Sequence, residues 1–288
     1  MLSIVGDLPA AVTPAATASD RLALRAAIEA VECREGAEAS PRTARIPTGW
    51  PDIDRALGGG LALNSVHEWF GLHESAEASG RVEQGGSGGV EQGGSGGGWL
   101  PPLTILLHLA HRATMHRAGL VVWIGARCHP SPPAMPRDLL SRSLFVSCDT
   151  RDQRIWAIDL SLRCAGVCAI IADASGLSMA ESRRCQLAAA AGAAEGNGGA
   201  LPLLARPSRE RAHLSAARTR WLVCPASFNE HGPGWSIDLL RCKGVRPTPE
   251  DARRWVVRHE HATGDVYLVP ESPARDGAAG QPPQRRTA

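Results

Sequence analysis

The sequence predicts an α/β fold with a mostly parallel central sheet and antiparallel strands at its C-terminal end, and three observations support this. Short apolar runs typical of buried strands occur in the middle of the chain, as at residues 120–125 and 167–172. Helical segments alternate with these runs, which favours right-handed crossovers between parallel strands. Near the C-terminus, apolar and polar residues alternate in four runs that favour antiparallel strands: residues 218–223, 236–242, 255–259 and 266–269.

Length and composition predict one globular core. The chain has 288 residues, of which 43% are hydrophobic and 21% are charged, as in an ordinary soluble protein. Ser19 and Asp20 can cap an N-terminal helix, which packs either on its own core or on a partner. We expect five parts: a flexible leader at 1–18, the N-terminal helix at 19–44, a core at 45–270, a disordered Gly-rich insertion at 72–98 within that core, and a disordered tail at 271–288.

The predicted core opens with a turn, a short helix and a glycine-rich bend. Thr48 and Gly49 form the turn, a helix is expected around residues 54–57, and the glycines at 58–60 permit a tight bend. An apolar strand follows at residues 66–70 and contains Glu68. Because a buried carboxylate needs a partner, Glu68 is either a structural acceptor or a remnant of site chemistry.

Helices and strands continue to alternate after the insertion. A Pro-rich loop at residues 126–138 is too rigid for a helix, and the strand at 167–172 ends at Asp173. The other expected elements are helices at 103–118, 138–142, 152–164 and 179–191, strands at 143–147 and 201–205, and a polar loop at 207–212.

The insertion begins where a nucleotide-binding α/β core would carry its phosphate-binding loop, G-x-x-x-x-G-K-[ST], after a strand that ends at Gly71. The chain has instead two identical copies of VEQGGSGG, at residues 82–89 and 90–97. This composition is typical of a flexible linker. Because a longer surface loop adds little closure entropy, we expect the fold to tolerate the expansion.

The order of these elements resembles the RecA-type core. The matching features are Thr48 and Gly49 in the turn, Asp52 and Asp54, the glycine bend, the strand from Glu68 to Gly71, and Asp173, which ends VCAIIAD where the fold carries its metal-assisting acid. Four C-terminal segments resemble a narrower family, ImuA, whose members are RecA-like accessory proteins of bacterial mutagenic translesion synthesis: ESRRCQLAAAAG, SAARTRWLVCPA, PGWSIDLLRCKG and RRWVVRHE. The resemblance covers about residues 45–260, and the spacers at 72–98 and 193–199 have no counterpart in it.

The resemblance implies a RecA-like core with a degenerate phosphate loop and a role in DNA repair. By this resemblance, the protein would join an ImuB-like Y-family polymerase homologue, itself catalytically inactive, to a DnaE-type error-prone polymerase at damaged DNA. RecA and single-stranded DNA are further candidate partners. The resemblance also implies a cytoplasmic protein of the SOS response that acts by protein–protein interaction, through its N-terminal helix and C-terminal strands.

Two groups needed for phosphoryl transfer are missing from their expected positions. A phosphate loop places a lysine on the terminal phosphates, and the only lysine of this chain is Lys243, near the end of the core. Ala126 and Arg127 follow the strand at 120–125, where recombinases carry a catalytic acid. We therefore expect no ATP hydrolysis, no catalytic residue and no cofactor, and we interpret four residues as remnants of a nucleotide site: Glu68, Gly71, Thr104 and Asp173.

Alternatives stay open for this site. Asp173 is either a strand-end or helix-capping acid or a ligand of Mg²⁺, and nucleotide binding without turnover is compatible with the sequence. The main alternative function is a divergent RecA-type DNA-dependent ATPase or recombinase. A single-stranded DNA-binding module is another.

Arginines and tryptophans of the C-terminal half are candidate contacts for a partner or for DNA, because guanidinium groups pair with phosphates and indoles stack on bases. The other interpretation is a solvated arginine face above core tryptophans. The formal net charge of +2 argues against strong nonspecific DNA binding. The candidates are Arg183, Arg184, Arg218, Arg220, Trp221, Trp235, Arg241, Arg254 and Trp255.

The remaining composition argues against several classes of protein. The eight cysteines form no C-x-x-C pair, which indicates reduced thiols in the cytoplasm. The sequence contains no apolar run of about 18 residues, so we expect no membrane span. Its first residues contain no basic region, so we expect no signal peptide. His108, His111 and His116 have no cysteine or acidic cluster to complete a metal site, so we expect no metal.

Overall fold

The structure is a computed structural model that describes residues 44–72, 98–194, 199–229, 232–244, 253–260 and 264–269. Four predicted parts lie outside the described residues: the leader at 1–18, the helix at 19–44 apart from its last residue, the insertion at 72–98 apart from its two ends, and the tail at 271–288. The large sheet described below belongs to one compact unit formed by Arg42–Cys242 and Pro247–Ala288.

Within the described residues, nine strands form one sheet. They are β3 (His67–Gly71), β4 (Leu120–Ile124), β5 (Ser143–Val146), β6 (Val167–Asp173), β7 (Leu201–Pro207), β8 (Thr219–Asn229), β9 (Gly232–Cys242), β10 (Arg254–His259) and β11 (Val266–Val269). Their order across the sheet is β11-β10-β9-β8-β3-β7-β6-β4-β5. The first parallel strand along the chain, β3, therefore lies near the centre of the sheet.

The sheet is mixed. Strands β5, β4, β6, β7, β3 and β8 pair in parallel, and β9, β10 and β11 extend the sheet through antiparallel pairs. The predicted α/β class, with a mostly parallel sheet and antiparallel C-terminal strands, is confirmed. One assignment was wrong: β8, which the sequence grouped with the antiparallel set, is parallel to β3 and antiparallel only to β9. Alternating apolar residues cannot reveal this, because a half-buried strand has the same pattern with either kind of neighbour.

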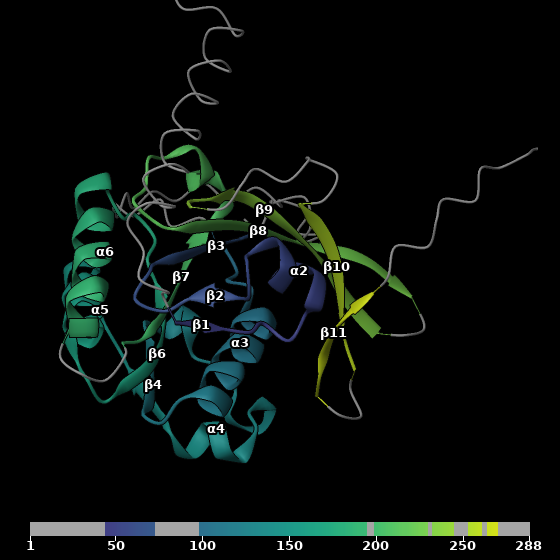
Figure 1. The fold of residues 1–288 in the computed structure, drawn as a ribbon, viewed down its shortest axis with the longest axis horizontal. Helices are drawn as coiled ribbons and strands as arrows, with labels where there is room; N and C mark the ends of the chain where they lie inside the picture. The colour runs from purple at the N-terminus through teal and green to yellow at the C-terminus, as the bar shows by residue number, and fades with distance from the viewer. Residues whose placement is uncertain are drawn as a thin grey trace, which may run out of the picture. The chain divides into compact units, whose positions relative to one another are not determined.

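Helices cover both faces of the parallel part of the sheet (Figure 1). They are α2 (Pro51–Ala56), α3 (Leu103–His116), α4 (Arg137–Ser141), α5 (Arg151–Arg163) and α6 (Met179–Ala194), with 3-10 turns η2 (Ala126–Cys128), η3 (Pro132–Ala134) and η4 (Ser208–Ala212). Strand side chains alternate between faces. Ile171 and Leu203 accordingly pack with α3, whereas Ile170 and Leu204 pack with α5 and α6.

Stacked tryptophans join β3 to β8 on the α3 face. The ring centroids of Trp69 and Trp221 are 5.0 Å apart with an interplanar angle of 7°. Such a pair contributes about 1 kcal/mol beyond the burial of its area. The Trp221 indole N–H also donates to the Thr219 hydroxyl at 2.7 Å, so the stack is fixed in orientation.

The opening of the core has the turn, helix and bend that the sequence predicts. The Thr48 backbone N–H and hydroxyl both donate to Asp54 at 2.8 Å, which ties the turn to α2. Gly60 has a φ of +112°, and a Cβ there would overlap the backbone of Ile46. A small sheet of β1 (Arg45–Ile46) and β2 (Leu61–Ala62) was not predicted, because strands of two residues show no periodicity.

Most predicted helices and strands are present with shifted ends. Helix α5 begins at Arg151 because Thr150 and Gln153 form a reciprocal capping box. The predicted polar loop at 207–212 is instead the last residue of β7 and the turn η4. The Pro-rich segment at 126–138 contains the short turns η2 and η3 before α4 begins.

The cysteines agree with the predicted reduced state as far as they are described. Seven of them lie in the described residues and are free thiols, and burial raises the pKa of Cys185 to about 12. In the described part of the chain, none of the helices has the length and apolarity needed to cross a membrane.

Candidate functional site at the carboxyl edge of the sheet

The carboxyl ends of β3, β6 and β7 meet at one edge of the sheet, which is where open α/β folds bind ligands. In register, Asp173 of β6 lies opposite Ala205 of β7, which lies opposite Trp69 of β3. Strand β3 leads from this edge to the start of α3. Three of the four predicted remnants, Gly71, Thr104 and Asp173, therefore lie at this edge of the sheet.

The chain that leaves β3 returns close to its starting point. The backbone N–H of Leu100 donates to the carbonyl of Leu72 at 2.9 Å. A Cβ at Gly71 would overlap the carbonyl of Leu100, so the close approach of the returning chain explains the glycine. The two ends of the predicted insertion are thus held together before α3 begins.

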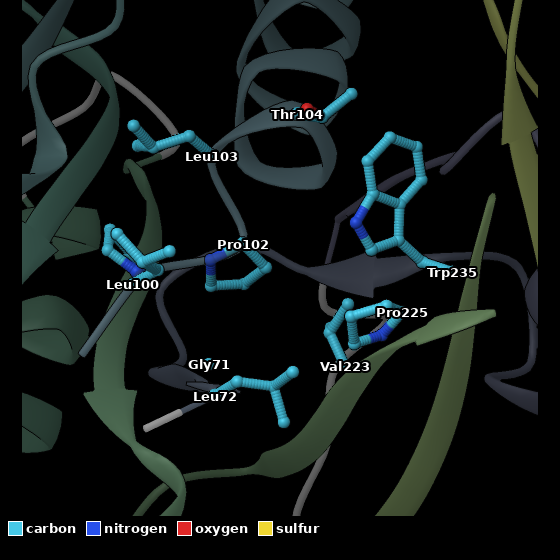
Figure 2. A pocket seen from close by; sticks show the side chains of 10 residues that line it. Gly71, Leu72, Leu100, Pro102, Leu103, Thr104, Val223, Pro225 and Trp235 are labelled. Atoms are coloured by element: carbon cyan, nitrogen blue, oxygen red, sulfur yellow. The ribbon is translucent and has the colours of Figure 1, made fainter. Parts of the chain in front are cut away.

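A pocket of about 290 Å³ lies between this returning chain, the start of α3 and strands β8 and β9 (Figure 2). Most of its lining side chains are apolar and none is charged, and the only hydroxyl among the lining side chains is that of Thr104. The lining residues are Gly71, Leu72, Leu100, Pro101, Pro102, Leu103, Thr104, Val223, Pro225 and Trp235.

The pocket differs in chemistry from a phosphate site. A phosphate loop presents several backbone N–H groups and a lysine to the phosphates. Here Pro101 and Pro102, which have no N–H, occupy the segment before α3, and none of the lining side chains is charged. The sequence shows the two prolines just before a predicted helix, but not that they line a pocket.

Asp173 is occupied by neighbouring protein groups. Its side chain is 2% exposed, and its Oδ1 accepts the backbone N–H of Ser175 at 3.0 Å. Its Oδ2 lies 3.4 Å from Arg127 Nη1 and 3.9 Å from Arg154 Nε. Of the two interpretations open at the sequence level, this geometry is that of a strand-end acid, because the carboxylate already has a backbone donor and two cations. Arg127 lies just after β4, at the position where recombinases carry a catalytic acid.

Glu68 is the centre of a buried ion network. Its carboxylate is fully buried and accepts from Arg206 Nη1 at 2.8 Å, Arg220 Nε at 2.8 Å and the Ser215 hydroxyl at 2.7 Å. Arg206 also pairs with Glu210 at 2.8 Å, so two arginines balance two carboxylates. A buried charge at Glu68 thus has the partners that it requires, which makes it a structural acceptor that joins β3, β7 and β8.

The sequence alone does not show that Glu68 pairs with Arg206 and Arg220. Arg220 was counted as a candidate contact for DNA or a partner, but its side chain is buried and its guanidinium group also lies 4.8 Å from the Phe70 ring centroid. Trp221 was another such candidate, and it is fully buried against Trp69. The structure corrects both assignments, because side chains inside the core cannot reach a partner's surface. The sequence did contain one indication of this network, because a carboxylate inside an apolar strand requires a buried partner.

The other candidate contacts lie in several different settings. Arg241 donates to the carbonyls of Ser215 and Ala217, both at 2.8 Å. Arg184 pairs with Asp159 at 3.0 Å, and Arg254 forms two hydrogen bonds of 2.7 Å with Asp238.

The remaining four candidates also have exposed or half-buried side chains. Arg183 is exposed on α6, and Arg218 is half-buried before β8. Trp235 and Trp255 are half-buried, and Trp235 lines the pocket. Of all nine candidates, the structure therefore brings only Trp235 to the site at the sheet edge.

The histidines of α3 have structural partners. His108 stacks on Trp50 with centroids 4.6 Å apart and contacts the Thr48 carbonyl at 2.8 Å, and burial lowers its pKa. His111 lies 3.1 Å from Asp138. The described residues contain no cluster of three or more His, Cys, Asp or Glu side chains arranged to hold a metal.

No protein-family model matches this chain, and no curated protein matches it.

Proposed function

We propose that this protein is a non-catalytic, RecA-like accessory factor of DNA-damage-induced mutagenic translesion synthesis. It binds an ImuB-like polymerase homologue and a DnaE-type error-prone polymerase and brings the two together at damaged DNA. Its core is RecA-like with a degenerate phosphate loop, and it acts by binding rather than by catalysis.

The observation that carries this proposal is the uncharged pocket between Gly71 and Thr104. Phosphoryl transfer depends on cations and N–H groups placed around the phosphates. This pocket offers prolines and aliphatic side chains at that position, and the one lysine of the chain is Lys243. An apolar pocket is suited to a protein partner, because apolar anchors in desolvated pockets dominate binding energy.

The arrangement around β3 supports the RecA-like part of the proposal. The hydrogen bonds from Thr48 to Asp54, the glycine bend and a central strand with Glu68 occur in the order that the resemblance requires. A strand–loop–helix unit from β3 to α3 is the setting of a phosphate loop. The antiparallel strands β9 and β10 extend the parallel sheet at the expected end.

The ion pairs of the surface arginines make the DNA-binding alternative less favourable. Arg184 and Arg254 each have a carboxylate partner, so binding of phosphates there would have to displace Asp159 or Asp238. Nonspecific DNA binding depends on unneutralised basic groups.

The test is co-elution of the purified full chain with the ImuB-like and DnaE-type proteins encoded in the same genome. We expect a ternary complex at micromolar concentrations without nucleotide. A chain that elutes alone at those concentrations would contradict the proposal, whereas a complex that forms only with Mg²⁺-ATP would favour the ATPase alternative.

A further inference from the structure

The pocket at the sheet edge is the open end of the hydrophobic core. Val223 belongs to the buried cluster under α3, and Trp235 packs against that cluster from the pocket side. The apolar surface of the core therefore continues into the pocket. Filling such a site removes more apolar area from water without disturbing the core.

Two exposed leucines stand at the edge of the pocket. Leu72 is 37% exposed and Leu100 is 60% exposed. Both lie where the chain leaves and re-enters the core, and their backbones are hydrogen-bonded to each other. Exposed apolar side chains around a pocket favour coverage by a protein surface, since a small metabolite would leave them in water.

Two polar groups of the pocket have no hydrogen bond to any residue that the structure describes. They are the Thr104 hydroxyl and the Trp235 indole N–H, and Figure 2 shows the indole nitrogen on the side of the ring that faces Pro102. An indole N–H only donates, so a ligand that displaces water from it must offer an acceptor such as a backbone carbonyl. The pocket thus combines an apolar volume with a donor at its wall.

We propose that the pocket receives one large apolar side chain, aromatic or leucine-like, from a segment of the partner protein, whose backbone carbonyl accepts the Trp235 indole N–H. A volume of about 290 Å³ is just below the range of about 300–1,000 Å³ that is usual for small-molecule sites, and it suits one side chain. The inference rests on the proposed function for the source of the segment.

The lining excludes charged occupants. A phosphate, carboxylate or ammonium group would lose its hydration without gaining an ion pair, because no lining side chain carries a charge. The nucleotide phosphates that a RecA-type site would hold are therefore unsuitable occupants. The anchor residue of the partner must be uncharged, and a charge directly beside it would weaken binding.

A capped amino acid tests the pocket without the partner. The probe is N-acetyl-phenylalanine methylamide, titrated into the full chain and followed by ligand-observed NMR and by tryptophan fluorescence. We expect a dissociation constant of about 1 mM. N-acetyl-aspartate methylamide is the matched charged probe and should show no saturable binding. A wild-type chain that does not bind the phenylalanine probe at about 20 mM would overturn the inference.

Two variants place the binding in this pocket. Thr104→Trp fills it and should weaken probe binding at least about tenfold, while the matched control Met115→Trp, on the exposed end of the same helix, should leave it unchanged. Trp235→Phe keeps an aromatic wall but removes the N–H, and it should weaken binding about threefold to tenfold. Equal probe binding by wild type, Thr104→Trp and Trp235→Phe would place the probe elsewhere and overturn the inference.

The same variants separate this inference from the proposed function. If the wild-type chain forms the polymerase complex and Thr104→Trp forms it equally well, the pocket inference fails and the accessory function stands. If the probe binds and Thr104→Trp abolishes its binding, but no polymerase complex forms, the pocket is an apolar site and the proposed function fails.

Discussion

The Leu100 backbone N–H donates to the Leu72 carbonyl at 2.9 Å, so the two ends of the repeat-containing insertion are hydrogen-bonded neighbours. Any chain length between them closes the same short gap. Closure of a longer loop costs only a little more entropy for each doubling of length. We therefore expect the fold to be insensitive to the length of the segment that carries the repeat at residues 82–97.

Shortening the insertion should leave the fold intact. Replacement of residues 73–97 by a Gly/Ser linker of about four residues should raise the free energy of unfolding by about 1–2 kcal/mol, because less closure entropy is lost on folding. Urea denaturation measures the change. A loss of several kcal/mol would show that these residues pack on the core.

Breaking the buried network at Glu68 should destabilise the protein strongly. Glu68→Gln leaves Arg220 without its carboxylate in the core and should cost about 3–5 kcal/mol in chemical denaturation. The matched control is Asp238→Asn, which breaks the exposed pair with Arg254 and should cost less than about 1 kcal/mol. Similar losses for the two variants would mean that Glu68 is not a structural acceptor.

The buried His67 should make stability depend on pH. Burial lowers the pKa of His67 to about 4, from an ordinary value of 6.5, and its ring nitrogens contact the Thr219 hydroxyl at 2.7 Å and the Ala62 carbonyl at 2.9 Å. Below pH 6.5 the unfolded chain binds the proton more readily than the folded chain. The stabilisation is complete above pH 6.5 and falls by about 3 kcal/mol as the pH drops to about 4.

His67→Gln tests this dependence, because it removes the titrating group. The slope of unfolding free energy against pH between 4 and 6.5 should flatten by that amount. An unaltered slope in His67→Gln would contradict the assignment of this pH dependence to His67.

Asp173 should matter for stability and not for nucleotide binding. Asp173→Ala leaves Arg127 and Arg154 without their shared carboxylate, so the unfolding free energy should fall by about 1–3 kcal/mol. Titration with a fluorescent ATP analogue and Mg²⁺ should give no saturable signal with either chain. Mg²⁺-dependent binding by the wild type that Asp173→Ala abolishes would restore the ATPase alternative.

Sequence patterns predicted the class of the fold because strands buried on both faces are continuous apolar runs that can be recognised in the sequence. The run VCAIIAD became β6, buried on both faces, and the Thr48 turn, glycine bend and β3 strand followed as expected. Strand direction at β8 and the two-residue strands β1 and β2 depend on long-range pairing, which no local pattern contains.

The candidate site was predicted in part. The absence of a lysine from the predicted phosphate loop was visible in the sequence. The apolar pocket was not, because it forms only where Val223, Pro225 and Trp235 meet α3, which lies more than a hundred residues earlier in the chain. Arg220 and Trp221 were predicted as surface contacts because arginine and tryptophan are common at binding interfaces. Their burial shows that both side chains lie inside, where the register of β8 with β3 places Arg220 opposite Glu68 and Trp221 opposite Trp69.

The proposed function requires the chain to bind polymerase partners without using ATP, and the most direct test is an affinity measurement with the purified ImuB-like protein. Isothermal titration calorimetry with and without Mg²⁺-ATP should give a dissociation constant of about 1 μM or tighter that is the same under both conditions. Absence of measurable binding, or binding that appears only with the nucleotide, would contradict the claim.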